Sequence, residues 1–260
     1  MTSSHVLAAA AAAQAAGPQY SILVAATPDE VRSAQRLRYS VFAEELGARL
    51  HTDVPGHDID EFDPHCDHLL VREDRSGEIV GTYRMLPPNK ATAAGRLYSE
   101  TEFDLSGLAP LRDRIVETGR SCVHPQHRSG AVINLMWTGI ARYLHLHGQR
   151  WLAGCASVPL ADGGATADSV WEVVRERHIS PPRLRVTPHH PYVFGPPPST
   201  KRAELVAAVP PLLRGYLRLG AWVCGEPALD EDFGVADFFV LLSLDRVDPR
   251  YLKHFLGEQS

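Results

Sequence analysis

The order of strand-like and helix-like segments limits the fold of this chain more than any other feature. Short apolar runs rich in β-branched and aromatic residues alternate with longer segments whose apolar residues recur at helical spacing. The order strand, helix, hairpin, strand, helix, strand, helix, strand, strand predicts a mixed α/β sheet with helices on both faces. The predicted strands cover residues 21–25, 68–73, 78–86, 115–123, 151–158, 221–224 and 238–242, and the predicted helices cover 28–46, 132–146, 168–178 and 211–219.

Composition and charge exclude several protein classes. The 260 residues are 44% apolar and 22% charged, with a net charge of −5, which excludes a disordered or fibrous chain and argues against binding nucleic acid through bulk positive charge. No apolar run reaches the 18 residues that a membrane-spanning helix needs. The four cysteines are widely spaced, so we expect reduced thiols in a cytoplasmic protein.

The predicted domain organisation is simple. Residues 1–19 are rich in alanine and are expected to form a flexible tail. Residues 20–260 are expected to form one domain, with an irregular proline-rich excursion at about 181–211.

An acidic segment is the first candidate for chemistry. Asp58, Asp60, Glu61 and Asp63 place four carboxylates within six residues, and these repel one another unless a cation lies among them. One interpretation is a solvated acidic loop, and the other is a charge-compensated site. A calcium loop is disfavoured because the glycine and the terminal glutamate of an EF-hand are missing.

Two predicted strands carry further charged residues. Arg84 lies within the strand 78–86, where an arginine is usually paired with an acid or placed at an edge. Strict alternation puts Glu117 and Arg120 on opposite faces, whereas a bulge near Gly119 would bring them together. A structural ion pair and a catalytic pair both fit this pattern.

The segment from His124 to Val132 joins a predicted strand to a predicted helix. Amide groups at a helix N-terminus, with Arg128 beside them, can bind an anion, although an ordinary strand–helix turn has the same sequence. The histidines lack partners at zinc-site spacing, so no metal site is expected. No G-x-S-x-G, Walker or G-x-G-x-x-G motif occurs, which argues against a serine hydrolase, a P-loop enzyme and a Rossmann dehydrogenase.

These pieces, in this order, resemble a known family. Arg38-Tyr39-Ser40-Val41-Phe42, Asp58-x-Asp60-x-x-Asp63, Gly81-x-x-Arg84 and Glu117-x-x-Arg120 resemble the acyl-homoserine-lactone synthase pattern. The segments 117–125, 154–159 and 212–221 resemble the related ornithine–acyl-carrier-protein N-acyltransferases, so that the resemblance covers roughly residues 20–256.

The resemblance implies a fold and a reaction. The implied fold is GNAT-like, a mixed, splayed β-sheet of the α/β (α+β) class flanked by helices, with a C-terminal extension and with strands 115–123 and 151–158 diverging. The implied reaction moves a 3-hydroxyacyl chain from acyl carrier protein to the α-amine of ornithine. The product is the lyso form of ornithine lipid, expected to pass to a membrane O-acyltransferase.

The resemblance also implies roles for individual residues, and it implies no bound cofactor. The expected catalytic group includes Glu117 as the base and backbone N–H groups near Cys122 and Val123 as oxyanion donors. Asp60 and Asp63 are expected to hold the cationic side chain of the acceptor, and Arg84 or Arg120 its carboxylate. The full expectation is catalytic residues Glu117, Arg120, Cys122 and Val123, substrate-binding residues Arg38, Phe42, Asp58, Asp60, Asp63 and Arg84, and phosphopantetheine-binding residues His127, Arg128, Ser129 and Gly130. We further expect Asp60, Asp63, Arg84, Glu117 and Arg120 to converge on one cleft.

One departure bears on the donor. Relatives that use coenzyme A carry two small residues in the pyrophosphate loop, where this chain has Ala131 and Ile133. Acyl carrier protein, whose arm has one phosphate, therefore fits better than coenzyme A, which stays a second candidate donor.

Several further functions remain compatible with the same motifs. They are synthesis of an N-acyl amino acid or of an acyl-homoserine-lactone-type signal, coenzyme A-dependent acetyl transfer, and acyl binding without catalysis. The expected location of the protein is the cytoplasm, with transient contact at the inner membrane surface.

Overall fold

The computed structural model describes residues 6–9, 18–196 and 201–256. The chain divides into two compact units: unit 1 is residues 1–94, 118–149 and 249–260, and unit 2 is residues 95–117 and 150–248. The division does not follow the proline-rich stretch, since 181–211 lies wholly within unit 2. The single domain over 20–260 stays a prediction.

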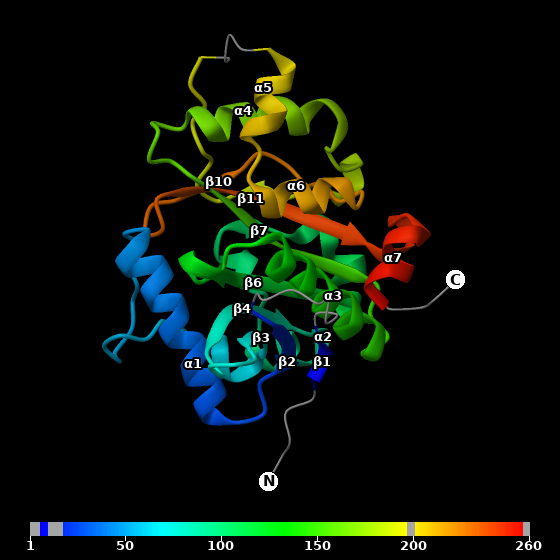
Figure 1. Ribbon diagram of the computed structural model, residues 1–260. Coiled ribbons are helices and arrows are strands. Elements are labelled where there is room, and N and C mark those ends of the chain that lie inside the picture. The colour runs from blue at the N-terminus through cyan, green and yellow to red at the C-terminus, as the bar shows by residue number, and fades with distance from the viewer. Residues whose placement is uncertain (1–5, 10–17, 197–200, 257–260) are drawn as a thin grey trace. The chain divides into compact units, whose positions relative to one another are not determined.

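Unit 1 is built on an antiparallel sheet whose strands follow the order β1, β2, β3, β4, and the 118–123 part of β6 comes next. Its helices include α3, which packs on β2 so closely that a Cβ at Gly139 would lie 2.3 Å from Ile22 Cδ1. The helix α7 lies against α3 (Figure 1). The elements are β1 (Val6–Ala9), β2 (Tyr20–Val24), α1 (Pro28–Tyr39), β3 (Asp67–Glu73), β4 (Ile79–Leu86), α2 (Pro88–Ala94), β6 (Ile115–Val123), α3 (Gly130–Leu146) and α7 (Pro249–Leu256).

The N-terminal part of unit 1 corrects one expectation and confirms another. Val6–Ala9 form strand β1, which pairs with β2 instead of belonging to a flexible tail, while residues 1–5 and 10–17 lie outside the described part. The predicted capping box is present, because Thr27 and Glu30 each accept a backbone N–H of the other. The helix continues beyond Tyr39 as a π-helix over Ser40–Glu45, which the sequence did not predict.

Unit 2 is built on the pair β7 and β11, which run antiparallel over nine residues. Strands β9 and β10 also pair with β11, and the two-residue strands β5 and β8 pair with each other. Helix α5 lies within the proline-rich region, where no helix was predicted. It packs beside α4, which precedes that region (Figure 1). The elements are β5 (Phe103–Asp104), β7 (Trp151–Pro159), α4 (Ala165–Arg177), β8 (Thr187–Pro188), α5 (Arg202–Ala208), α6 (Pro211–Arg218), β9 (Trp222–Val223), β10 (Ala228–Asp230) and β11 (Val235–Ser243).

Strand β6 begins in unit 2, where it lies beside β7 as predicted, and the two strands run parallel. The paired residues are Ile115 with Trp151, Val116 with Leu152 and Glu117 with Ala153, and the pairing stops there although both strands continue. The first part of β6 therefore places Glu117 at the end of a short parallel ladder. None of the helices formed by described residues has the length and apolar character that a bilayer crossing requires.

Candidate functional site

Three arginines and three aspartates of unit 1 form one cluster, here called the arginine–aspartate cluster. Arg38 Nε lies 2.8 Å from Asp58 Oδ2, and Arg38 Nη2 lies 2.7 Å from Asp63 Oδ2. Arg84 Nη1 lies 2.6 Å from Asp60 Oδ1 and 3.0 Å from Asp63 Oδ1. Arg120 Nε lies 3.3 Å from Asp58 Oδ2, and Arg120 Nη2 lies 3.4 Å from Asp60 Oδ2. The members are Arg38, Asp58, Asp60, Asp63, Arg84 and Arg120.

Local hydrogen bonds explain how the acidic segment is held in the cluster. Asp60 Oδ1 accepts the backbone N–H groups of Phe62 at 2.9 Å and Asp63 at 3.1 Å, which fixes a turn. Gln35 of α1 donates its side-chain amide to Asp63 Oδ2 at 3.0 Å, and its backbone carbonyl accepts the Asp58 N–H at 3.0 Å. The segment is therefore bound to α1, and the interpretation as a solvated acidic loop is wrong.

The charges of the cluster compensate one another. Burial would raise the pKa of Asp63, but Arg38 and Arg84 lower it well below its ordinary value. Burial likewise opposes ionisation of Asp60, yet Arg84 and Arg120 leave its pKa lowered. Three cations and three anions leave the cluster formally neutral, so Asp60 and Asp63 already have cations before any acceptor arrives.

Arg120 reaches the cluster through an irregular backbone. Its φ of +50° lies in the left-handed region, which a residue with a Cβ seldom adopts. A bulge was predicted near Gly119 so that Glu117 and Arg120 could meet; the left-handed residue lies one position after Gly119, and the meeting of the two side chains stays a prediction. The salt bridges to Asp58 and Asp60 hold Arg120 in this conformation.

Glu117 makes two backbone contacts within unit 2. Its side chain is buried, and its two oxygens accept the backbone N–H groups of Tyr98 at 2.5 Å and Ser99 at 2.8 Å. Of the five residues expected to converge, the structure joins Asp60, Asp63, Arg84 and Arg120 in unit 1, whereas Glu117 belongs to unit 2. The role of Glu117 as the base stays a prediction.

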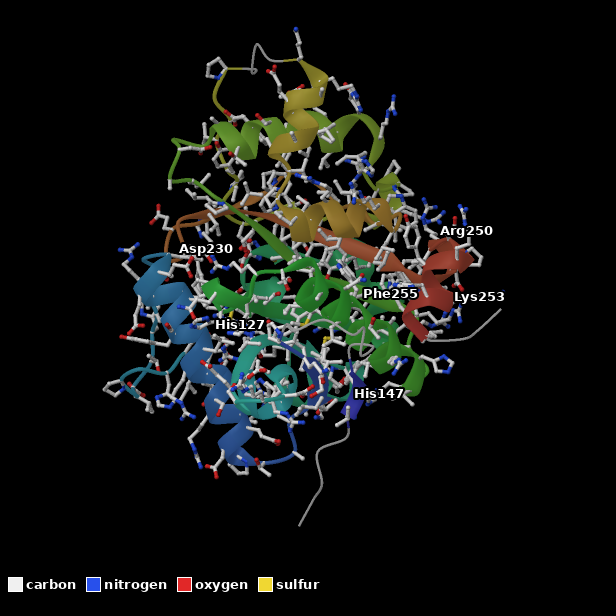
Figure 2. The ribbon with its side chains drawn as sticks, in the orientation of Figure 1. His127, His147, Asp230, Arg250, Lys253 and Phe255 are labelled. Atoms are coloured by element: carbon white, nitrogen blue, oxygen red, sulfur yellow. The ribbon has the colours of Figure 1, made fainter. Side chains whose placement is uncertain are left out.

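The predicted phosphate-binding loop lies in unit 1 at the start of α3. Ser129 is the N-cap and Gly130 the first helical residue, with Ser129 Oγ accepting the Val132 N–H. Arg128 forms a bidentate pair with Glu45 at 2.7 and 2.6 Å. His127, labelled in Figure 2, contacts the Tyr20 hydroxyl through Nδ1 at 2.9 Å. An anion that binds Arg128 therefore has to compete with Glu45.

The remaining predicted residues lie next to this loop. Cys122 is buried against Leu37 and Val41, and Phe42 packs against the same group. Burial raises the pKa of the Cys122 thiol to about 12, so it is protonated at neutral pH and unsuited to act as a nucleophile. The Val123 carbonyl accepts a hydrogen bond from Arg128 Nε at 3.1 Å.

Sequence reasoning missed a second group of titratable side chains, which lies in unit 2. Within the described part of the chain, Glu102, Cys155 and Asp237 are the group whose potential metal-binding atoms lie within 4.8 Å of one another. One signal was available, since Asp237 is the only charged residue in the apolar run that forms β11.

The buried carboxylates of the arginine–aspartate cluster predict acid sensitivity. Asp60 and Asp63 have lowered pKa values when folded, so their contribution to stability is present above the unfolded value of about 3.9 and is lost as pH falls below it. We expect the melting temperature to decrease when the pH is lowered past about 4. In an NMR titration, Asp63 should stay ionised at pH values where exposed carboxyl groups are already protonated. A stability that stays constant from about pH 5 to about pH 2.5 would contradict this.

Comparison with known proteins gives one consistent family. A family model described as an acetyltransferase (GNAT) domain matches residues 37–138. The L-ornithine N(alpha)-acyltransferase of Brucella abortus is 36% identical over 251 residues, covering 88% of this chain and 85% of that protein. The L-ornithine N(alpha)-acyltransferase of Rhodobacter capsulatus is 34% identical, covering 93% of this chain and 96% of its own length.

Solved structures agree with the expected fold. The crystal structure of TofI in a ternary complex with an inhibitor and MTA has a TM-score of 0.52 and 18% sequence identity, covering 89% of this chain and 96% of that chain. With the family match, this likeness confirms the GNAT-like fold, a mixed sheet flanked by helices.

Proposed function

Because the chain belongs to the L-ornithine Nα-acyltransferase family, we propose that it transfers a 3-hydroxyacyl chain from acyl carrier protein to the α-amine of ornithine. The product is the lyso form of ornithine lipid, which a membrane O-acyltransferase would then use. The observation that carries the proposal is the identity of 34–36% to enzymes of this name over most of both chains.

The reaction forms an amide bond and breaks a thioester. The α-amine of the acceptor must lose a proton before it attacks, since a free α-amine is largely protonated at neutral pH. We assign Glu117 to accept that proton, and the backbone N–H groups at Cys122 and Val123 to stabilise the tetrahedral oxyanion. The electron pair of the broken C–S bond leaves with the carrier thiolate, which then takes up a proton.

The neutral arginine–aspartate cluster is assigned a positioning role. Arg38 is fully buried and makes hydrogen bonds to both Asp58 and Asp63, which favours a structural task over direct substrate contact. Asp60 and Arg120 keep 19% and 13% of their side-chain surface exposed, so they are the members we expect nearest to substrate. Because Asp63 is buried with two arginines, Asp60 is the better placed of the two acids expected to meet the acceptor.

Acyl carrier protein is the donor that the loop at the start of α3 favours. Ala131 and Ile133 stand where small residues would admit a pyrophosphate, while Ser129, Gly130 and Arg128 suit a single phosphate. Purified protein should therefore make N-acylornithine, detected by mass spectrometry, faster from acyl carrier protein than from coenzyme A with the same acyl chain. Equal or faster rates with coenzyme A would overturn the donor assignment, and no N-acylornithine from either donor would overturn the function.

Glu45→Gln is expected to lower the KM for acyl carrier protein by about two- to five-fold and to leave kcat unchanged. The Arg128–Glu45 pair is half-exposed, and such an ion pair contributes about 0.2–1 kcal/mol. In the variant this pair is absent, so the donor phosphate binds Arg128 without first breaking it. The matched control is Glu44→Gln, which removes the same charge from the neighbouring residue. A KM that rises in Glu45→Gln, or falls equally in both variants, would contradict the competition.

A cytoplasmic enzyme with transient membrane contact fits the proposed product. Helix α7 carries Arg250, Lys253 and an exposed Tyr251, and it buries Phe255 (Figure 2). Basic and aromatic side chains of this kind suit the headgroup region of an anionic membrane.

A further inference from the structure

One surface of unit 1 combines cations with exposed apolar side chains. It is formed by α7, by the C-terminal end of α3 and by β1, and α3 packs against both of the other elements (Figure 1). Arg142 of α3 joins the three elements, because its guanidinium donates to the backbone carbonyls of Leu7 in β1 and of the last two residues of α7. The surface is here called the basic face, and its exposed members are Val6, Leu146, Arg250, Tyr251, Lys253 and His254.

Helix α7 turns a charged side to solvent. Phe255 is buried, and Leu252 and Leu256 are half-buried, which is the spacing of one helix face. Arg250 and Lys253, labelled in Figure 2 together with Phe255, are exposed. Because the apolar side of α7 is already packed on the protein, the side left for a partner is the cationic one.

The basic face has an excess of positive charge. Neither α3 nor α7 nor β1 contains an aspartate or a glutamate, although the chain as a whole has a net charge of −5. Their full cations are Arg142, Arg250 and Lys253. The hydrogen bonds of Arg142 to backbone carbonyls leave its charge in place. Asp248 directly precedes α7, at the helix end where an acid is favoured. A local excess of positive charge on an acidic protein indicates an anionic partner.

The apolar members of the basic face favour a bilayer as that partner. Leu146 is 68% exposed, Val6 55% and Tyr251 44%. Leu146 follows Arg142 by one helical turn, so it lies on the side of α3 that contacts β1 and α7. A membrane interface accepts all three kinds of side chain, because cations meet anionic headgroups, tyrosine lies at headgroup level and aliphatic groups enter the acyl boundary. A nucleic acid would complement the cations only.

We propose that the basic face binds the surface of an anionic phospholipid bilayer. The inference deepens the proposed function and rests on it for its purpose, since a product that carries an acyl chain and is used at the membrane can leave the enzyme directly into the bilayer. Binding itself is a property of the surface and needs no turnover, so it can be tested separately.

Helix α3 keeps the basic face away from the expected donor loop. The loop residues Ser129 and Gly130 lie at the start of α3, and Leu146 is its last residue. Seventeen residues at 1.5 Å each make the helix about 25 Å long. His127 of the loop accordingly lies apart from Arg250 and Lys253 in Figure 2. Acyl carrier protein at the loop and a bilayer at the basic face can therefore bind at the same time.

The experiment measures sedimentation of the purified protein with vesicles of phosphatidylcholine, with and without phosphatidylglycerol. The parent should partition at least about 10-fold more strongly onto the anionic vesicles, and added salt should remove the difference. Arg250→Gln combined with Lys253→Gln should weaken this partitioning by about 10- to 30-fold, since each cation near such a surface contributes about five-fold. The matched control is Arg32→Gln combined with Arg36→Gln, which removes two exposed cations from α1 and should partition like the parent.

A second pair of variants tests the apolar members of the basic face. Leu146→Ser should weaken partitioning onto anionic vesicles by about three-fold, because a leucine that enters the acyl boundary is lost. Its matched control is Val193→Ser, which changes an 83% exposed apolar side chain in unit 2 and should have no effect. Equal effects of the two variants would contradict the location of the membrane contact.

The outcomes separate this inference from the proposed function. Equal binding to both kinds of vesicle, or unchanged binding after the Arg250 and Lys253 substitutions, would overturn the membrane contact alone. A higher KM for acyl carrier protein in that double variant, with vesicle binding unchanged, would assign the basic face to the carrier protein instead. A parent that binds anionic vesicles but makes no N-acylornithine would overturn the proposed function and leave the membrane contact standing.

Discussion

Arg38→Met is expected to lower the free energy of unfolding by about 3–5 kcal/mol, the range for removing one partner of a buried ion pair. Arg38 has no exposed surface, and its guanidinium holds Asp58 and Asp63. Methionine replaces much of the volume but none of the charge, so the buried aspartates lose a cation while Arg84 and Arg120 stay. Urea denaturation of the purified variants measures the change.

Arg32→Met is the matched control, since Arg32 lies on the same helix. Its pair with Asp29 has a similar distance of 2.8 Å, but the two side chains are 54% and 90% exposed. Exposed pairs contribute at most about 1 kcal/mol. Similar losses in both variants would show that burial of the arginine–aspartate cluster adds no stability of its own.

The elements were predictable where a local signal coincided with a periodic pattern. The helix beginning at Pro28 has a capping box, and the hairpin of β3 and β4 has strand-forming residues on either side of a turn. Helix α5 and the π-helix Ser40–Glu45 were missed, because the first lies among prolines and the second differs from an α-helix only in its hydrogen bonds. Strand β1 was missed because its alanines have low strand propensity.

The grouping of charged residues was predictable in part. Charge repulsion among Asp58, Asp60 and Asp63 indicated that cations had to lie among them, and Arg84 and Arg120 do so. Helical spacing puts Arg38 on an apolar face and gives no sign that it neutralises the acids; only the family resemblance grouped it with them. Glu102 was missed for a similar reason, since only the fold brings it to Asp237.

Glu117→Gln is expected to lower kcat/KM by about 10²-fold or more, the range for losing general-base help. The oxygens of Glu117 accept the backbone N–H groups of Tyr98 and Ser99, which hold the side chain in place, and a carboxylate can accept a proton directly or through a water. The amide nitrogen of glutamine lacks that capacity. The pH profile of kcat/KM should also lose the limb that rises with deprotonation of the base.

A matched variant separates the loss of the base from damage to the turn that Glu117 holds. Glu100 belongs to the same turn, accepts the Leu97 N–H at 2.6 Å and pairs with Arg112, so Glu100→Gln disturbs the local backbone in a similar way. We expect Glu100→Gln to keep activity within a few-fold of the parent and to retain the pH profile. If both variants lose activity equally and both keep the rising limb, Glu117 acts by holding Tyr98 and Ser99, and the proton must go to another group. If only Glu117→Gln loses the rising limb, Glu117 accepts the proton of the attacking amine.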